Sequence, residues 1–392
     1  VPGILIASFE PSDALKQKKK PTGGSYRKYF ISFQFTLASV LMSSTFLVYK
    51  QLNYIFNKDL GFKKENIIHV PLKGKMAENY TLIKQQLLNN PNIEQITNGS
   101  PIFSSGVEFP EWTWDGVNKD EKHSIANIQA DYNFIKAFNI EIDRGENFSE
   151  DNSNKNKVII NEEAAKVMKM ANPVSQHMQL KGEDYEIIGV VKNFHSRHFS
   201  NKIRPLMITY SAGGQNLYIH YKNDDDKANI IGLARNEYEK FNAEFPFEYQ
   251  FFADEFTAYY RNEHKMLNLL LYFVVVAFFI IGFGLYGLSK QMTLSKTKEI
   301  GIRKVNGAKI SEILTMLNKD FVKCITIAFC IATPIAYYAT HKWLENFAYK
   351  TTLSWWIFIL AGAFAMGIAF ITVSWQSWKA ATRNPVEALR YE

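Results

Sequence analysis

Four runs of apolar residues stand apart from long polar stretches along this chain. They cover residues 29–49, 266–288, 321–340 and 355–378. Each run is close to the roughly 20 helical residues that cross a hydrocarbon core about 30 Å thick. Basic residues flank the runs, which is typical of membrane proteins and unusual for buried helices of a soluble protein. The pattern therefore predicts an α-helical transmembrane protein with four helices.

Polar and small residues give three of these runs distinct features. Gln34 lies in the first run, where its amide can hydrogen-bond to a helix backbone or to a neighbouring helix. Pro334 lies in the third run, removes one backbone donor and predicts a kink. In the fourth run Ala363 and Gly367 stand at a spacing that favours close helix packing, so we expect that face to contact another helix.

The distribution of Lys and Arg predicts the orientation of the chain. These residues gather before the first run, between the second and third runs, and after the fourth run, at Lys16, Lys18, Lys19, Lys20, Arg27, Lys28, Lys290, Lys296, Lys298, Arg303, Lys304, Lys309, Lys319, Lys379, Arg383 and Arg390. The segment between the third and fourth runs has only Lys342 and Lys350. Because short cytoplasmic loops are enriched in Lys and Arg, both termini are predicted to be cytoplasmic.

The predicted spans divide the rest of the chain into five segments. They are the cytoplasmic tails at residues 1–28 and 379–392, an extracytoplasmic domain at residues 50–265, a cytoplasmic loop at residues 289–320 and a short external loop at residues 341–354.

The charge of the chain is segregated in the same way. Residues 50–264 contain 25 Lys and Arg against 30 Asp and Glu, whereas the rest of the chain contains 20 against 8. A nucleic-acid-binding protein carries its basic excess on the folded domain, so nucleic acid is excluded as a partner. Both cysteines, Cys324 and Cys330, lie in one apolar run, which excludes a disulfide framework in the polar domain.

The polar domain has the pattern of a mixed α/β fold with two small lobes. Residues 158–160 form a short apolar strand, followed after Asn161 by a helix with apolar residues at helical spacing. Further strands are predicted at residues 185–194, 205–210, 216–221 and 247–252, and a helix at residues 228–241. The order of the strands does not follow from the sequence.

Candidate chemistry in this domain is weak, and we predict no catalytic residue. His195 and His198 form an H-x-x-H motif, but a catalytic zinc site requires three protein ligands, and the motif follows a strand. These weak metal candidates are better interpreted as histidines of a surface loop. Trp112 and Trp114 could stack on a sugar or an apolar peptide, although packing between lobes is the commoner role. Residues 104–106 lack the strand–turn–helix context of a nucleophile elbow.

Residues 297–317 are the most informative polar segment. Five residues separate Gly301 from Gly307, and Ala308 separates Gly307 from Lys309, so the segment is not a phosphate-binding loop and no cofactor is expected to bind directly. The pattern predicts a helix, a turn at Asn306 and Gly307, and a second helix. That helix is predicted to present Ile310, Ile313, Leu314 and Leu317 on one side. Two interpretations remain: helices that lie on anionic lipid, or a docking element for a cytoplasmic partner.

Two motifs border the membrane part of the chain: TKEIGIRKVNGA at residues 297–308 and NPVEALRYE at residues 384–392. In these motifs the sequence resembles the FtsX-type permeases of ABC transporters, and the resemblance extends over residues 25–392. KVIINEEAAKVM at residues 157–168 and YEIIGVVKNFH at residues 185–195 resemble the MacB-like extracytoplasmic core domain. SQHMQL at residues 175–180 departs from the glycine-lysine turn that is usual in relatives, which puts the local hairpin in doubt.

The resemblance implies a non-enzymatic permease in a bacterial inner membrane. A separate cytoplasmic ATPase dimer would use ATP and move the second span. The expected cargo class is a peptide, an antibiotic or a lipoprotein; the alternative output is activation of a cell-wall hydrolase or a sensor. The expected partners also include a second permease module or copy, membrane lipid, and a periplasmic or outer-membrane protein. The docking residues implied by position are Glu299, Gly301, Ile302, Arg303, Lys304, Gly307 and Ala308.

A short internal repeat suggests a tandem arrangement. Residues 10–16, EPSDALK, match residues 384–390, NPVEALR, with Pro, an acidic residue, Ala, Leu and a basic residue in the same order. We therefore expect residues 1–16 to be the tail of a preceding module.

Overall fold

The computed structural model describes residues 23–103, 107–110, 112–114, 117, 123–151, 153–241 and 244–382. The repeat at residues 10–16, its counterpart at residues 384–390 and residues 104–106 lie outside the described residues. The chain divides into two compact units. The helical unit comprises Val1–Gln51, Lys265–Glu345 and Thr351–Glu392, and the α/β unit comprises Leu52–His264 and Asn346–Lys350.

Long helices form the helical unit, as the apolar runs predicted. They are α3 (Gly23–Asn57), α9 (Arg261–Ser295), α11 (Ile310–Leu344) and α12 (Trp355–Ala381), with the short α10 (Thr297–Val305) between α9 and α11. Four of these helices are long and apolar enough to cross a membrane, over Tyr29–Asn57, Arg261–Gln291, Ile310–Leu344 and Trp355–Trp375. The helices are longer than the apolar runs because flanking polar residues continue the helical backbone.

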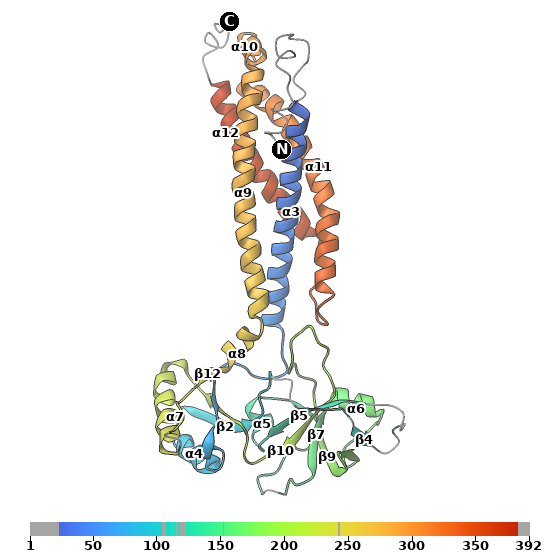
Figure 1. Cartoon of the computed structure of the whole chain (residues 1–392), viewed down its shortest axis with the longest axis vertical. Coiled ribbons are helices and arrows are strands. Elements are labelled where there is room, and N and C mark those ends of the chain that lie inside the picture. Colours follow the sequence, from blue (N-terminus) through green and yellow to red (C-terminus); the bar gives the residue numbers. More distant parts are fainter. Residues whose placement is uncertain are drawn as a thin grey trace. The chain divides into compact units, whose positions relative to one another are not determined.

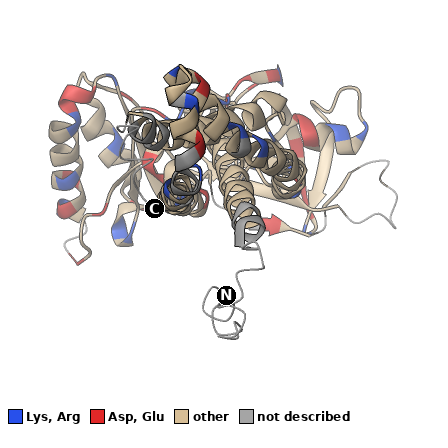
Figure 2. Ribbon diagram, turned by 90° about the horizontal axis from the view of Figure 1, so that it is seen from above, with Lys and Arg blue, Asp and Glu red and all other residues tan. Residues whose placement is uncertain are grey.

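All four long helices contribute to one apolar core. Figure 1 shows them running alongside one another, and in Figure 2, viewed from above, they are mainly tan because charged residues are scarce along them. The core residues are Ile31, Phe35, Ala38, Ile281, Leu285, Phe321, Ile325, Ala328, Ala365, Ala369 and Val373. Pro334 lies inside α11, which continues through it.

The small residues that permit close packing of α12 differ from those predicted. Ala363 and Gly367 are exposed, whereas Ala361, Ala365 and Ala369 are buried. The apolar run was uniformly hydrophobic, so the sequence alone did not reveal which face of α12 meets its neighbours.

The described residues of the α/β unit form a 12-stranded mixed sheet. The strand order is β12-β1-β11-β2-β5-β10-β7-β9-β8-β4, with β3 paired to β5 and β6 to β9. The strands are β1 (Ile67–Pro71), β2 (Ile93–Gly99), β3 (Val107–Phe109), β4 (Trp112–Trp114), β5 (Ile125–Ala130), β6 (Ile142–Gly145), β7 (Lys157–Asn161), β8 (His177–Leu180), β9 (Glu183–Val191), β10 (Leu206–Tyr210), β11 (Asn216–Tyr221) and β12 (Gln250–Phe251). The helices are α4 (Tyr80–Leu88), α5 (Phe134–Ala137), α6 (Glu162–Met168), α7 (Lys227–Phe241) and α8 (Phe252–Tyr259).

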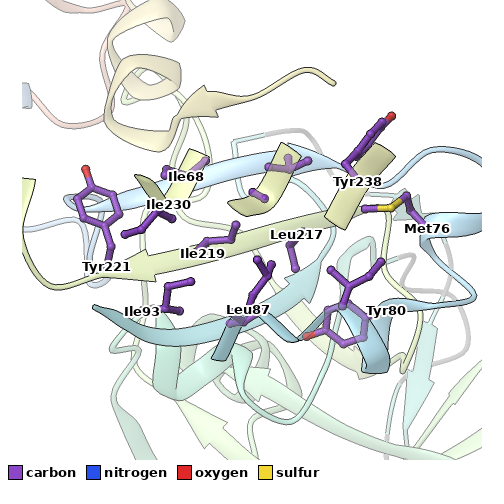
Figure 3. Close-up of a cluster of buried hydrophobic side chains, with 14 residues drawn as sticks. Ile68, Met76, Tyr80, Leu87, Ile93, Leu217, Ile219, Tyr221, Ile230 and Tyr238 are labelled. Carbon is purple, nitrogen blue, oxygen red and sulfur yellow. The ribbon is translucent and has the colours of Figure 1, made fainter. Parts of the chain in front are cut away.

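Among the described residues, two hydrophobic clusters on different parts of the sheet agree with the predicted mixed α/β domain of two lobes. In the first, α4 and α7 pack on β1, β2 and β11; Figure 3 shows Leu87 and Ile230 among the strand residues Ile68 and Ile219. In the second, α6 packs on β5, β7, β9 and β10 together with β4 and β8. Among the described residues, β2 and β5 share the one pair Gly99 and Ala130, so the sheet is narrow where the lobes meet.

The turn from β7 into α6 follows from its sequence. The Asn161 Oδ1 accepts the backbone N–H of Ala164 at 2.9 Å, which satisfies a donor at the open end of the helix. Glu162 and Glu163 occupy the first turn, where the positive end of the helix dipole favours carboxylates. The predicted strand-to-helix transition is therefore present.

Candidate coupling segment

The short helix α10 occupies most of the segment between the second and third long helices. Lys296 alone separates the end of α9 from the start of α10. At the end of α10, the Ala308 N–H donates to the Arg303 carbonyl at 3.0 Å, and the Asn306 N–H donates to the Ile302 carbonyl at 3.1 Å. Gly307 adopts φ +85°, the left-handed conformation that such a helix terminus requires. The structure thus has a tight turn at the predicted position.

An apolar contact holds α10 against the first turns of α11. Ile300 packs with Ile313 and Leu317, and all three are buried. Ile310, which was predicted on the same side, is instead 41% exposed, and Leu314 is half-buried. The prediction placed Ile310 on the packed face, but this residue begins the helix directly after the turn. The contact joins α10 to α11 as one structured element.

The opposite side of α10 is exposed and combines apolar with charged side chains. Ile302 is 50% and Val305 is 67% exposed. Glu299 and Arg303 form an ion pair of 3.0 Å across one helical turn. Both partners are solvent-exposed, so the pair contributes only about 0.3–0.5 kcal/mol and both groups stay available.

The structure distributes the predicted docking residues over both sides of this element. Glu299, Ile302, Arg303 and Gly307 are exposed, Ala308 is half-buried and Gly301 is buried. Lys304 lies in α10, and its side chain is outside the described part of the chain. The exposed set could bind a protein partner through apolar contact and through charge of both signs.

The two histidines of the H-x-x-H motif lie among aromatic side chains. His195 is 8% exposed and stacks on Phe199 with ring centroids 4.3 Å apart, so its interpretation as a surface-loop histidine is wrong. Burial, with a smaller contribution from Lys58, lowers the pKa of His195 to about 4. His198 Nε2 lies 3.2 Å from Glu263 Oε1. Within the described residues, no group of three or more His, Cys, Asp or Glu side chains is placed to hold a metal ion.

The two tryptophans belong to the second core of the α/β unit. Trp112 is 2% and Trp114 is 8% exposed, and their ring centroids are 4.6 Å apart. Their strand β4 pairs with β8, which places both rings over the apolar face of the sheet. Packing, rather than stacking on a sugar or peptide, therefore accounts for these residues.

Two family models match this chain in adjoining regions. A MacB-like periplasmic core domain matches residues 38–237, and an FtsX-like permease C-terminal domain matches residues 271–385. An uncharacterized ABC transporter permease, YknZ of Bacillus subtilis (strain 168), is 23% identical over 270 residues, which cover 66% of this chain and 68% of that protein.

Solved structures of extracytoplasmic domains also resemble the chain. The periplasmic region of MacB from Actinobacillus actinomycetemcomitans gives a TM-score of 0.36 at 11% identity and covers 53% of this chain and 98% of that one. The extracellular domain of YknZ from Gram-positive bacteria gives 0.35 at 14% identity, with 47% and 98% covered. A domain of a putative permease from Porphyromonas gingivalis gives 0.35 at 14% identity, with 48% and 90% covered.

The four candidate membrane helices and the α/β unit agree with the order of these two family domains along the chain. The core-domain match spans half of the chain, and the permease match spans most of the residues after it. The chain therefore belongs to the FtsX-like, MacB-type family of ABC transporter permeases.

Proposed function

We propose that this permease transmits ATP-driven motion from a cytoplasmic ATPase dimer to its extracytoplasmic α/β unit. The motion serves the export or extraction of a cargo of the peptide, antibiotic or lipoprotein class. The permease lies in a bacterial inner membrane, with both termini and residues 289–320 on the cytoplasmic side. A second copy or a second permease module completes the assembly, and the ATPase supplies all nucleotide chemistry.

The attachment of α10 to both α9 and α11 is the observation that carries this proposal. Lys296 is the single residue between α9 and α10, and Ile300 ties α10 to Ile313 and Leu317 of α11. A force on α10 therefore displaces two membrane helices instead of bending a flexible loop. The exposed Ile302, Val305 and Arg303 provide the side chains on which a partner can act.

Charge reversal tests the docking surface directly. The permease is purified in detergent from the cells that express it naturally, and the amount of ABC ATPase that co-purifies with it is measured. The double change Arg303→Glu and Lys304→Glu is expected to reduce retention of the ATPase by about tenfold or more. Acidic groups of the ATPase that bind Arg303 and Lys304 would instead be repelled by the two introduced carboxylates. The matched control is Lys155→Glu, on an exposed loop of the α/β unit, which leaves retention unchanged. Equal retention by the double variant and the control refutes docking at α10.

Labelling with a membrane-impermeant thiol reagent tests the proposed orientation. Cys324 and Cys330 are first replaced by Ser, and single cysteines are then introduced as Asn306→Cys and Lys181→Cys. Reagent added outside intact spheroplasts is expected to label the variant at Lys181 and not the variant at Asn306. The opposite labelling pattern contradicts the orientation, whatever the ATPase experiment finds.

A further inference from the structure

The segment between α11 and α12 belongs to the α/β unit and not to the helices that flank it. Asn346–Lys350 clusters with Leu52–His264, although Glu345 and Thr351 on either side belong to the helical unit. The chain therefore passes between the units at four places, two of them at the ends of this five-residue loop. A connecting loop usually lies on the surface with few contacts, so the attachment of this loop to the α/β unit is unusual.

Backbone hydrogen bonds attach the loop to the residues that follow β9. The N–H groups of Ala348 and Tyr349 both donate to the Phe199 carbonyl, at 3.0 and 3.2 Å. The Ile203 N–H donates to the Tyr349 hydroxyl at 3.4 Å. The N–H of Phe199 in turn donates to the Tyr260 hydroxyl at 3.1 Å, just before α9 begins. The backbone of Phe199 thus joins the loop to the start of the second span.

Aromatic rings enclose these hydrogen bonds. Phe199 and Tyr260 are 0% exposed, and Phe347 is 5% exposed. The His195 ring lies against Phe199 and meets the Tyr349 ring edge-on, with centroids 4.6 Å apart. The hydrogen bond between the Phe199 N–H and the Tyr260 hydroxyl is buried, so it is costly to break without a replacement.

His198 fastens the same cluster to α9. The Ser200 backbone N–H donates to His198 Nδ1 at 3.2 Å. Nε2 then faces the Glu263 carboxylate at 3.2 Å. His198 also lies 4.4 Å from the Tyr260 ring, measured between centroids. His198 therefore contacts both the turn after Phe199 and the start of α9, which is a positioning role.

Very few residues connect the loop to the next hydrogen-bonded positions of the chain. Tyr349 is bound to Phe199, and after Lys350 the Thr351 N–H donates to the Gln51 side chain at 2.8 Å within the helical unit. Lys50 Nζ donates to the Thr352 carbonyl at 2.9 Å and to Ser354 Oγ at 2.8 Å. Lys350 is the single residue between the two sets of attachments, and one residue spans at most about 3.6 Å.

We propose that Asn346–Lys350 and residues 195–200 form a clasp through which movement of α11 and α12 reaches the α/β unit. His198 and Tyr260 are its positioning residues. The clasp gives the third and fourth spans their own mechanical connection, beside the direct connections of α3 and α9. This inference rests on the proposed function for the origin of the movement, while the clasp itself is a property of the chain alone.

Hydrogen exchange of the full chain in detergent tests the clasp without any partner. Peptides that cover residues 346–350 are expected to exchange at least about tenfold more slowly than an unstructured peptide, because the Ala348 and Tyr349 amides both donate to the Phe199 carbonyl. Two variants, Tyr260→Phe and His198→Ala, remove hydrogen bonds of the cluster, and His198→Gln is the milder control. Tyr260→Phe and His198→Ala are expected to speed exchange about tenfold, whereas His198→Gln, whose amide can still donate to Glu263, has a smaller effect. Fast exchange in the unaltered chain, or no change in either disruptive variant, overturns the clasp.

A lengthened connection tests transmission. Four Gly and Ser residues are inserted between Lys350 and Thr351, and a control chain carries them between Lys181 and Gly182 at the β8–β9 turn. Both chains are expected to bind the ATPase as the unaltered chain does and to retain slow hydrogen exchange at residues 346–350. The ATP-dependent change in exchange at residues 195–203 is expected to fall at least about threefold for the first insertion only. An undiminished change overturns transmission through the clasp. Failure of the ATPase to bind the unaltered chain refutes the proposed function instead, and the exchange of residues 346–350 still decides the clasp.

Discussion

Lys84 Nζ lies 3.1 Å from Asp131 Oδ2, and the two side chains are 8% and 2% exposed. Lys84 belongs to α4 of the first lobe, and Asp131 directly follows β5 of the second. The Tyr80 hydroxyl donates to the same carboxylate at 2.7 Å, and Thr97 donates to its other oxygen. This buried network lies where Gly99 and Ala130 form the pair between β2 and β5, so it holds the lobes together across the narrow part of the sheet.

Removing the charge of Lys84 is expected to destabilise the α/β unit strongly. In Lys84→Met the Asp131 carboxylate stays buried without its cation, which typically costs about 3–5 kcal/mol. The free energy of unfolding of the full chain in detergent, followed by tryptophan fluorescence during denaturant titration, measures the effect.

The matched control for this change is Lys63→Met. Lys63 forms an ion pair of 3.3 Å with Glu94, but the partners are 35% and 46% exposed. Such pairs contribute about 0–1 kcal/mol, so the control should change the free energy of unfolding by no more than that. Similar losses for the two variants would show that the Asp131 network does not stabilise the fold.

Two glycines with the same backbone conformation are expected to differ sharply in tolerance to alanine. Gly145 has φ +77° and Gly182 has φ +82°, so each Ala variant carries a conformational cost of about 1–2 kcal/mol. A Cβ on Gly145 would lie 2.2 Å from the Ile188 carbonyl oxygen, whereas no described atom lies within 4 Å of one on Gly182. Gly145→Ala should therefore cost about 1–3 kcal/mol more than Gly182→Ala in denaturant unfolding. Equal losses would contradict the close approach of β6 to β9.

Acidification is expected to destabilise the α/β unit partly through His220. Burial, with a smaller effect of Lys63, lowers the pKa of His220 to about 3, against about 6.5 in an unfolded chain. Between these values the unfolded state binds a proton that the folded state does not, so the free energy of unfolding falls as the pH falls. From about pH 7 to about pH 5 the loss from this residue is about 2 kcal/mol.

His220→Phe isolates that contribution to the pH dependence. The ring is buried against Phe138, and Nε2 has no hydrogen-bond partner among the described residues, so Phe can take its place. The variant should lose about 2 kcal/mol less than the unaltered chain over the same pH interval, measured by denaturant unfolding at both values. The same loss in both proteins would show that His220 is not the group that titrates.

The turn after α10 should tolerate Asn far better than Ala at Gly307. The residue has φ +85°, and no described atom lies within 4 Å of the position that a Cβ would take, so the backbone conformation alone decides the outcome. Gly307→Ala costs about 1–2 kcal/mol locally, whereas Asn adopts this conformation more readily. Exchange of the Ala308 amide, which donates to Arg303, should therefore rise about 5–30-fold in Gly307→Ala and less in Gly307→Asn. Identical rates in the two variants would contradict the turn.

Much of the architecture could be predicted from single segments of the sequence. The apolar runs predicted four spans because the cost of placing a residue in hydrocarbon depends on that residue and its immediate neighbours. Gly307 predicted the turn because φ preference is a property of one residue. Asn161 predicted the start of α6 in the same way, since its side chain bonds an amide three residues away.

Other features depended on contacts between distant parts of the chain. The order of strands places β10 between β5 and β7. The residues of one strand do not reveal which other strand it pairs with, so this order could not be predicted. His195 belongs to a polar motif after a strand, which predicted a surface loop. In the structure its ring packs against Phe199 and Tyr349. The packed face of α12 contains Ala361, Ala365 and Ala369, because neighbouring helices lie on that side.

The sequence by itself therefore determined the presence of four membrane-spanning helices, the start of α6, the turn after α10 and the α/β class of the polar domain, because each depends on local hydrophobicity or backbone preference. Only the tertiary structure decided that Asn346–Lys350 joins the α/β unit and that Phe199, Tyr260 and His198 hold it there. The free energy of those contacts comes from burying groups that lie far apart in the chain, and it exists only after folding has brought them together.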